Sequence, residues 1–174
     1  MIELRYESGT LVATGEKPPE PFVWDSRTRQ WRAPAGAYRE TVLSLRESGI
    51  PHRDLAGNFE KLRLESRVSI EMRPYQSQAL AAWWKAGLRG VVVLPTGAGK
   101  TTVAVRAMER TSRSTLVVVP TLALMKQWYS VLQDAFGGSI EIGLLGGGYH
   151  EITPITVTTY DSAYIHADRY GDRF

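Results

Sequence analysis

The chain of 174 residues has no cysteine, only three histidines and no long apolar run. Without cysteine it cannot form disulfides or thiolate metal sites. A membrane-spanning helix needs about 20 predominantly apolar residues, and none is predicted. Met1 is followed by Ile2-Glu3-Leu4-Arg5, which is not typical of a signal peptide. We therefore expect a cytoplasmic protein with no membrane contact.

The chain also has little excess of one charge over the other. The 21 Lys and Arg residues barely exceed the 18 Asp and Glu residues, which gives a net charge of +3 and a pI near 9.3. This balance permits nucleic-acid binding without arguing for it. The length allows one or two domains, each with a real core.

The N-terminal third predicts a small mixed α/β domain. Alternating patterns and turn residues favour two hairpins, formed by residues 2–6 with 11–13 and by residues 22–25 with 30–33. Helical spacing predicts a helix over 37–48, ended by Gly49 and Pro51. Residues 59–64 alternate again and are predicted as a strand. We expect this domain to cover residues 1–64 and a linker to cover 65–72.

Two tryptophans in the second hairpin are candidates for DNA contact. Trp24 and Trp31 interleave with Arg27, Arg29 and Arg32, a combination that can stack on exposed bases and pair with phosphates. The alternative is a solvated hairpin tip whose tryptophans pack the small core.

The strongest signal is the run from Leu94 to Thr102, Leu-Pro-Thr-Gly-Ala-Gly-Lys-Thr-Thr. An apolar run over 91–94 predicts a buried strand before it, and a helix is predicted after it from Thr102. Glycines between a strand and a helix allow the backbone to turn its N–H groups toward an anion, and the helix N-terminus adds its dipole. A nucleoside triphosphate is the ligand that this arrangement predicts.

Individual roles follow from the chemistry of this loop. Lys100 is expected to reach the β and γ phosphates of ATP, and the Thr101 hydroxyl to bind the accompanying Mg²⁺. The loop residues expected to contact the nucleotide are Thr96, Gly97, Ala98, Gly99, Lys100, Thr101 and Thr102. The alternative is a glycine turn that happens to carry a lysine, because the general pattern asks for glycine where this chain has Leu94.

The remaining pattern predicts a parallel sheet with helices. A helix is predicted from the run Arg73-Pro74-Tyr75-Gln76 onward, and a second from Thr121 to about Phe136. Strands are predicted over 114–120, 140–145 and 155–159, with 146–150 as a loop. The order strand, helix, strand, helix, strand is typical of an α/β fold.

Several of these segments together resemble one family, the XPB-type superfamily 2 DNA helicases, and especially their short archaeal forms. The resemblance rests on Arg73-Pro74-Tyr75-Gln76 as the Q motif, 94–102 as motif I, 118–128 as motif Ia and 156–160 as motif Ic. It implies a damage-recognition domain at the N-terminus, followed by an incomplete RecA-like parallel-sheet P-loop domain over 73–174.

The resemblance also implies site residues. Gln76 would read the adenine edge and Arg73 would lie in the nucleotide site. Motifs Ia and Ic would bring Pro120, Thr121, Gln127, Thr158 and Thr159 to the DNA backbone, and threonine hydroxyls and helix N-termini are ordinary phosphate ligands. For each residue the alternative is a strand end or a helix cap.

One motif that such motors need is missing. No Asp-Glu pair occurs in the chain, although the family uses this pair to hold Mg²⁺ and prepare the attacking water. Asp161 follows a predicted strand, but residues 155–160 look too polar for a buried run. We therefore expect an N-terminal portion of a longer motor that does not hydrolyse ATP efficiently alone, with Lys100 as its one recognisable catalytic residue.

Three functions remain open from the sequence. The first is an ATP-dependent helicase or translocase in nucleotide excision repair, acting on distorted DNA with a second helicase domain and a repair nuclease as partners. In a prokaryote it would associate with the nucleoid. The second is the motor subunit of a restriction enzyme, and the third is a DNA-binding module with a vestigial phosphate loop.

Overall fold

The computed structural model describes residues 1–57, 59–69 and 71–174. It divides into two compact units, one formed by Met1–Phe59 with Asp161–Phe174 and one formed by Glu60–Tyr160. Each unit has its own hydrophobic core. In the described part of the chain, no helix has the length and apolar character needed to cross a membrane.

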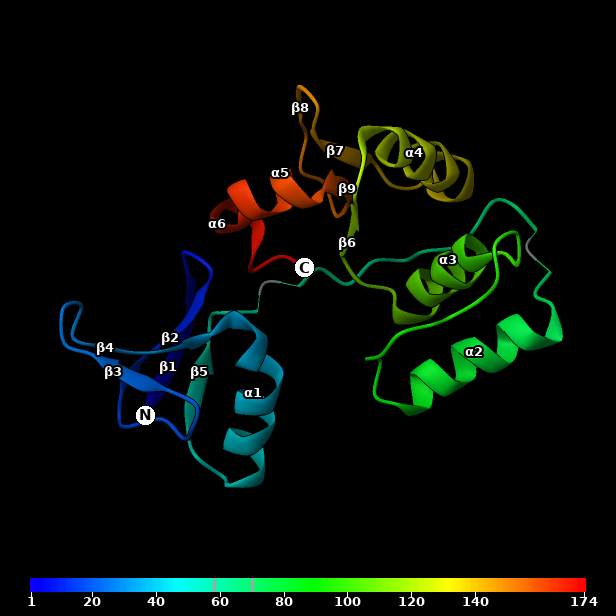
Figure 1. Ribbon diagram of the computed structural model, residues 1–174. Coiled ribbons are helices and arrows are strands. Elements are labelled where there is room, and N and C mark those ends of the chain that lie inside the picture. Colours follow the sequence, from blue (N-terminus) through cyan, green and yellow to red (C-terminus); the bar gives the residue numbers. More distant parts are fainter. Residues whose placement is uncertain (58, 70) are drawn as a thin grey trace. The chain divides into compact units, whose positions relative to one another are not determined.

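The first unit is built on a five-stranded sheet (Figure 1). Its strands are β1 (Ile2–Glu7), β2 (Thr10–Gly15), β3 (Val23–Asp25), β4 (Gln30–Pro34) and β5 (His52–Asp54), in the order β3-β4-β2-β1-β5. The β1–β2 and β3–β4 pairs are antiparallel, which confirms both predicted hairpins. Only β5 runs parallel to its neighbour, β1.

One helix covers this sheet and contributes two buried side chains to its core. A short 3-10 turn, η1 (Ala35–Ala37), leads into α1 (Tyr38–Glu47), which confirms the predicted helix. Val42 and Leu45 of α1 pack with Leu4 and Leu11 of the sheet. All four side chains are less than a tenth exposed, because the alternating strands and the helix each present one apolar face.

The C-terminal residues belong to the same unit. Two short helices, α5 (Tyr160–Ile165) and α6 (Ala167–Tyr170), end the chain. The Tyr6 hydroxyl donates a hydrogen bond of 2.8 Å to the carbonyl oxygen of Ala167, and Tyr170 is only 4% exposed. The segment is thus hydrogen-bonded to β1 through Tyr6, with Tyr170 buried in the same unit.

The predicted strand over 59–64 is wrong. These residues form no strand, and only an isolated bridge joins Lys61 to Arg113. A strand that the sequence does not predict, His52–Asp54 of β5, pairs with β1 instead. Three residues are too few to show an alternating pattern, so this strand is defined by its partner rather than by its sequence.

The second unit carries a four-stranded sheet in the order β6-β9-β7-β8. These strands are β6 (Thr115–Val119), β7 (Ile142–Gly146), β8 (Tyr149–His150) and β9 (Ile155–Thr159). β6, β9 and β7 are mutually parallel, and β8 turns back antiparallel to β7. With its helices α2 (Pro74–Lys85), α3 (Lys100–Thr111) and α4 (Leu122–Phe136), the unit has the predicted architecture of an incomplete RecA-like α/β domain (Figure 1).

Helix α4 packs on the sheet and closes the core of this unit. Met125, Leu132 and Phe136 are fully buried against strands β7 and β9. They lie on one face because their spacing follows the helical period. At the start of α4 the Thr121 hydroxyl accepts a hydrogen bond of 3.2 Å from the backbone of Leu124, which confirms the predicted helix cap.

The expectation that residues 155–160 are too polar for a buried run is wrong for residues 155–159, which form strand β9. All five of its residues are buried. Its threonines fit because their hydroxyls find backbone acceptors: Thr156 donates to Thr153 O at 2.7 Å, and Thr158 donates to Leu145 O at 2.8 Å. A satisfied hydroxyl costs little to bury, and the rest of the β-branched side chain packs well in a strand.

The apolar run before the phosphate loop is the second wrong element. Residues 91–94 form no strand, and Val91 and Val93 are 89% and 84% exposed. A strand needs a hydrogen-bonding neighbour, and no described segment pairs with these residues. The side chains of Val91 and Val93 are therefore left without an apolar surface to pack against in this structure.

The predicted loop over 146–150 is a tight hairpin. Gly146 pairs with Tyr149 and Leu145 with His150, so only Gly147 and Gly148 form the turn. Both glycines have positive φ, at 62° and 92°, as hairpin turns of two residues require. Sequence analysis missed β8 because it contains only two residues.

Candidate nucleotide and DNA site

The glycine loop has the conformation that an anion cradle needs. Gly97 and Gly99 have φ angles of 76° and 77°, where a side chain would strain the backbone. Gly99 is the N-cap of α3, so the unpaired N–H groups of the first helical turn begin at Lys100. A Cβ atom on Gly97 would meet nothing within 4 Å, so the loop faces open space.

The lysine of the loop is folded back on the loop itself. Lys100 Nζ donates to the carbonyl oxygens of Leu94 at 3.0 Å and Pro95 at 3.1 Å. Both bonds are exposed, and bonds from the ammonium to anionic phosphate oxygens, in which both partners are charged, would be stronger. The ammonium group is thus held beside the loop by two backbone carbonyl oxygens.

Gln76 is the best-defined polar residue of the site. It is 4% exposed, and its Nε2 donates 2.8 Å to the carbonyl oxygen of Ala98. Its Oε1 accepts a bond of 2.8 Å from the backbone N–H of Arg73, which closes the first turn of α2. The Tyr75 hydroxyl donates to the same Ala98 oxygen at 3.2 Å. The start of α2 is therefore fastened to the glycine loop.

A polar cavity of about 370 Å³ lies between these two elements. Its lining residues are Ser69, Glu71, Arg73, Gln76, Gly97, Ala98, Gly99 and Thr102. Five of the predicted nucleotide residues besides Gln76 thus share one cavity with it. Ser69 and Glu71 were missed by sequence analysis, and their position just before the Arg73-Pro74-Tyr75-Gln76 run is the signal that could have found them.

The remaining predicted nucleotide residues lie beside this cavity in the same loop and helix turn. Thr96 is exposed, Lys100 is exposed and Thr101 is half-buried in the first turn of α3. Within the described residues, no hydrogen bond engages the Thr101 hydroxyl, so it is available to a cation. Nowhere in that part of the chain do three His, Asp or Glu side chains gather as a preformed metal site.

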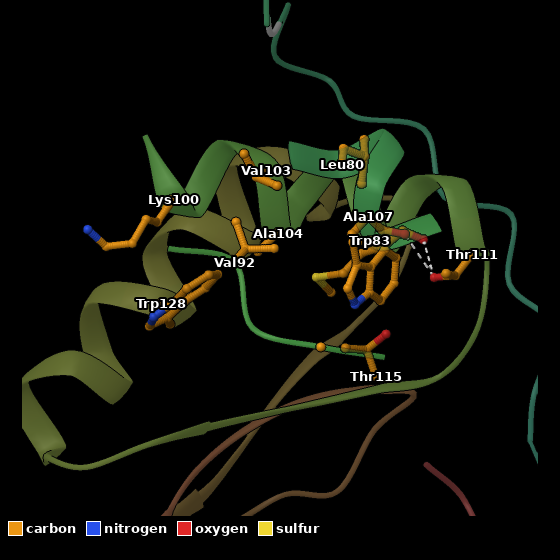
Figure 2. A pocket seen from close by; sticks show the side chains of 12 residues that line it. Leu80, Trp83, Val92, Lys100, Val103, Ala104, Ala107, Thr111, Thr115 and Trp128 are labelled. Carbon is orange, nitrogen blue, oxygen red and sulfur yellow. Dashed lines mark hydrogen bonds between the residues drawn. The ribbon is translucent and has the colours of Figure 1, made fainter. Parts of the chain in front are cut away.

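A larger cavity of about 550 Å³ has a different character. Figure 2 shows its mainly apolar walls, which come from α2, α3 and α4 and include Trp83, Val103 and Trp128. The Lys100 ammonium points away from the other lining side chains (Figure 2). Apolar walls do not compensate for the desolvation of a triphosphate, so the smaller polar cavity is the candidate nucleotide site.

The predicted DNA residues of motif Ia are exposed side chains near the start of α4. Pro120, Thr121 and Gln127 are all exposed, at the end of β6 and in the first turns of α4. Backbone N–H groups at a helix N-terminus attract phosphate. The geometry permits the contact that the sequence predicts.

The predicted residues of motif Ic are placed differently. Thr158 is fully buried and its hydroxyl is committed to Leu145 O, and Thr159 is 8% exposed at the end of β9. A contact from the Thr158 side chain to DNA would require the sheet to open. Thr159 is the residue of this pair that lies at the strand end.

The two tryptophans of the first unit form a cross-strand pair. Trp24 and Trp31 lie opposite each other in β3 and β4, with ring centroids 5.2 Å apart in an edge-to-face arrangement. Trp24 is 48% exposed, whereas Trp31 packs on the core and lies under the Lys17 ammonium, 5.8 Å from its ring centroid. Trp24 is thus the ring with a free surface.

The arginines around this pair are mostly engaged. Arg27 donates hydrogen bonds to Asp25 from its side chain and its backbone N–H, and these bonds lower the pKa of the Asp25 carboxyl. Arg32 donates to Thr10 at 2.9 Å and to Glu7 at 3.2 Å. Arg29, at the tip, has no hydrogen bond or ion pair within the described residues and is the available cation.

Two family models match the chain. Residues 69–174 match the model described as "Type III restriction enzyme, res subunit", and residues 4–56 match the "Xeroderma pigmentosum group B helicase damage recognition domain". The first match covers the nucleotide site and the second covers the five-stranded sheet.

Curated relatives carry the same pair of segments. The "DNA 3'-5' translocase XPB2" of Sulfurisphaera tokodaii is 35% identical over all 174 residues, which span 38% of that protein. The "DNA 3'-5' helicase XPB" of Kineococcus radiotolerans is 36% identical over 88% of this chain and 26% of its own length. The "General transcription and DNA repair factor IIH helicase/translocase subunit XPB" of Schizosaccharomyces pombe is 33% identical over 38% of this chain and 9% of its own length.

Proposed function

The chain belongs to the family described as the type III restriction enzyme res subunit and resembles XPB helicases along its length, and we propose that it is the N-terminal part of an ATP-driven DNA helicase or translocase. The chain spans less than two fifths of the relative that it matches along its whole length. The observation that carries the proposal is the hydrogen bond from Gln76 to Ala98, two residues that line the same polar cavity beside the glycine loop.

ATP with Mg²⁺ is the ligand that fits this site best. The open face of Gly97 and the first turn of α3 suit phosphate, and Lys100 is close enough to exchange its two carbonyl acceptors for phosphate oxygens. Thr101 would hold Mg²⁺, and Arg73 and Gln76 would face the base. Mg²⁺ held there would supply positive charge that offsets the negative charge of the phosphates.

The DNA proposal uses both units. Pro120, Thr121 and Gln127 would contact the backbone, with Thr159 at the neighbouring strand end, and Trp24 would stack on bases exposed by a distortion. Thr158 is left out because its hydroxyl is buried and bonded to Leu145 O. The domain limits of 1–64, 65–72 and 73–174, a cytoplasmic or nucleoid location and a repair role belong to the same proposal. So do the further partners, a second helicase domain and a repair nuclease.

A restriction motor is the less favoured alternative. The family description for residues 69–174 names such a subunit, but residues 4–56 match the damage-recognition domain of the XPB helicase, which points to the repair class. A vestigial loop is the other alternative, and it predicts no nucleotide binding.

The test is binding of a fluorescent ATP analogue, with Mg²⁺, to the whole chain. We expect saturable binding that Lys100→Ala weakens by at least tenfold, because charge-assisted phosphate bonds are lost. Lys17→Ala, which removes an exposed lysine of the first unit, is the matched control and should bind like the unaltered chain. Binding that is absent, or that is equal in both variants, would contradict the proposal.

A further inference from the structure

A separate cavity lies between the tip of the β7–β8 hairpin and the start of α4. It measures about 230 Å³ and is lined by Leu122, Met125, Lys126, Gly147, Gly148 and Tyr149. We propose that this groove binds one unstacked base of single-stranded DNA on the Tyr149 ring, with the adjacent phosphate at Lys126. The inference rests on the proposed function and extends its DNA surface beyond helix α4.

The hairpin tip is held firmly against the helix. A Cβ atom on Gly147 would lie 2.7 Å from Leu122 Cδ2, so the turn packs directly on the first residue of α4. A Cβ atom on Gly148 would meet nothing within 4 Å, which leaves the outer side of the tip open. The groove therefore has a packed wall and an open side that a strand can approach.

The exposed side chains suit a nucleotide. Tyr149 is 42% exposed and Leu122 is 48% exposed, although both are bulky and lie at the groove. Lys126 is exposed, and no hydrogen bond or ion pair engages it in the described part of the chain. An aromatic ring with an apolar neighbour accepts a base, and a free ammonium accepts its phosphate.

Continuity with the proposed motif Ia contacts selects DNA as the occupant. Lys126 adjoins Gln127 in α4, and Leu122 adjoins Thr121, which caps the same helix. A backbone that runs over the start of α4 therefore reaches the groove with its next nucleotides. The strand must be single because both faces of a base in a duplex are covered by its neighbours.

The experiment measures anisotropy of a labelled oligothymidylate of about 12 nucleotides, a length within the usual single-strand site sizes, and of the same strand with abasic sites. On the intact strand Tyr149→Ala should weaken binding by about tenfold, because stacking on one base is lost. On the abasic strand it should change nothing. Tyr149→Phe should retain binding on both strands. Tyr164→Ala, which removes a tyrosine that is 87% exposed in α5, is the matched control.

Lys126→Ala separates the phosphate contact from the stacking contact. It should weaken binding to intact and abasic strands alike and reduce the slope of log K against log salt by about 0.7, the contribution of one single-strand phosphate.

Three outcomes would overturn the inference. If Tyr149→Ala binds the intact strand as the unaltered chain does, while Thr121→Ala and Gln127→Ala weaken binding, the groove proposal fails and the proposed function stands. If Tyr149→Ala loses equal affinity on intact and abasic strands, the ring does not stack. If the unaltered chain binds no DNA, both proposals fail.

Discussion

The side-chain nitrogen of Gln76 donates a 2.8 Å hydrogen bond to the carbonyl oxygen of Ala98, in the middle of the glycine loop. A glutamine amide has two N–H donors and one oxygen. One donor is used at Ala98, and the oxygen is used at the backbone of Arg73. The second N–H remains for a base edge, so one residue can shape the loop and read the nucleotide.

Gln76→Ala should therefore damage stability and binding together. The partly buried Ala98 oxygen loses its shorter hydrogen bond and keeps the one from Tyr75, which costs about 0.5–1.5 kcal/mol of unfolding free energy. Affinity for the fluorescent ATP analogue should fall as well, because the loop is no longer held. Urea unfolding and anisotropy measure the two effects. Gln78→Ala, an exposed glutamine one half-turn further along α2, is the control and should change neither quantity.

The two loop glycines should respond differently to alanine. Both have φ near 77°, which costs an alanine roughly 1–2 kcal/mol. At Gly99 the new Cβ would also lie 2.3 Å from Gln76 Nε2, whereas at Gly97 it meets nothing within 4 Å. Gly99→Ala should thus lower the urea midpoint clearly more than Gly97→Ala. Equal midpoints would show that Gln76 does not crowd the loop.

Trp24 should carry base recognition in the first unit. Trp24→Ala is expected to abolish any preference of the chain for a duplex with a mismatch bubble over an intact duplex, because about 1–3 kcal/mol of stacking is lost. Trp24→Phe should keep most of the preference. Anisotropy at several salt concentrations separates this effect from phosphate contacts. A preference that survives Trp24→Ala would assign the tryptophan to packing.

The docking of the C-terminal segment should weaken at alkaline pH. Burial, reinforced by the charges of Asp168 and Asp172, raises the pKa of the Tyr6 hydroxyl above its usual value of 10.0. Because the folded state holds this proton more tightly than the unfolded chain, the stabilisation is complete below pH 10 and is lost as the pH rises through the folded pKa.

Tyr6→Phe tests this dependence, since it removes the bond to Ala167 without a large change of shape. Urea unfolding should show the variant about 0.5–1.5 kcal/mol less stable near pH 8, and the difference should disappear above the folded pKa. Tyr164→Phe is the control, because that side chain is 87% exposed. A difference in unfolding free energy between the two chains that stays constant with pH would mean that the Tyr6 proton does not contribute to stability.

Local signals predicted most of the fold. The helices and hairpins followed from periodicity and turn residues, and the Thr121 cap followed from its side-chain chemistry. The errors all concern strands. Residues 91–94 are apolar enough for a strand but have no neighbour to pair with, whereas His52–Asp54 and Tyr149–His150 become strands because a neighbour is present. Pairing is a property of tertiary structure, which a local pattern does not contain.

The candidate site shows the same division between features that a local pattern predicts and features that depend on tertiary structure. The glycine loop is predicted because a phosphate cradle has its own local sequence, whereas Gln76 is predicted from the resemblance to the helicase Q motif. The hydroxyl of Thr158 could not be assigned, since its acceptor, Leu145, belongs to another strand. The proposed pairing of Tyr149 with Lys126 has no local signal for a similar reason: 23 residues separate them in the sequence, and the packing of the hairpin on α4 brings them to one groove.

The most direct test is a residue-resolved NMR titration of the 19.4 kDa chain with ATP and Mg²⁺. The account predicts that the backbone amides of 96–102 and the side-chain amide of Gln76 shift first and saturate together. Signals from Trp83 and Trp128, in the apolar cavity, should change little. Shifts confined to those tryptophans, or no shifts at all, would contradict the assignment of the glycine loop as the nucleotide site.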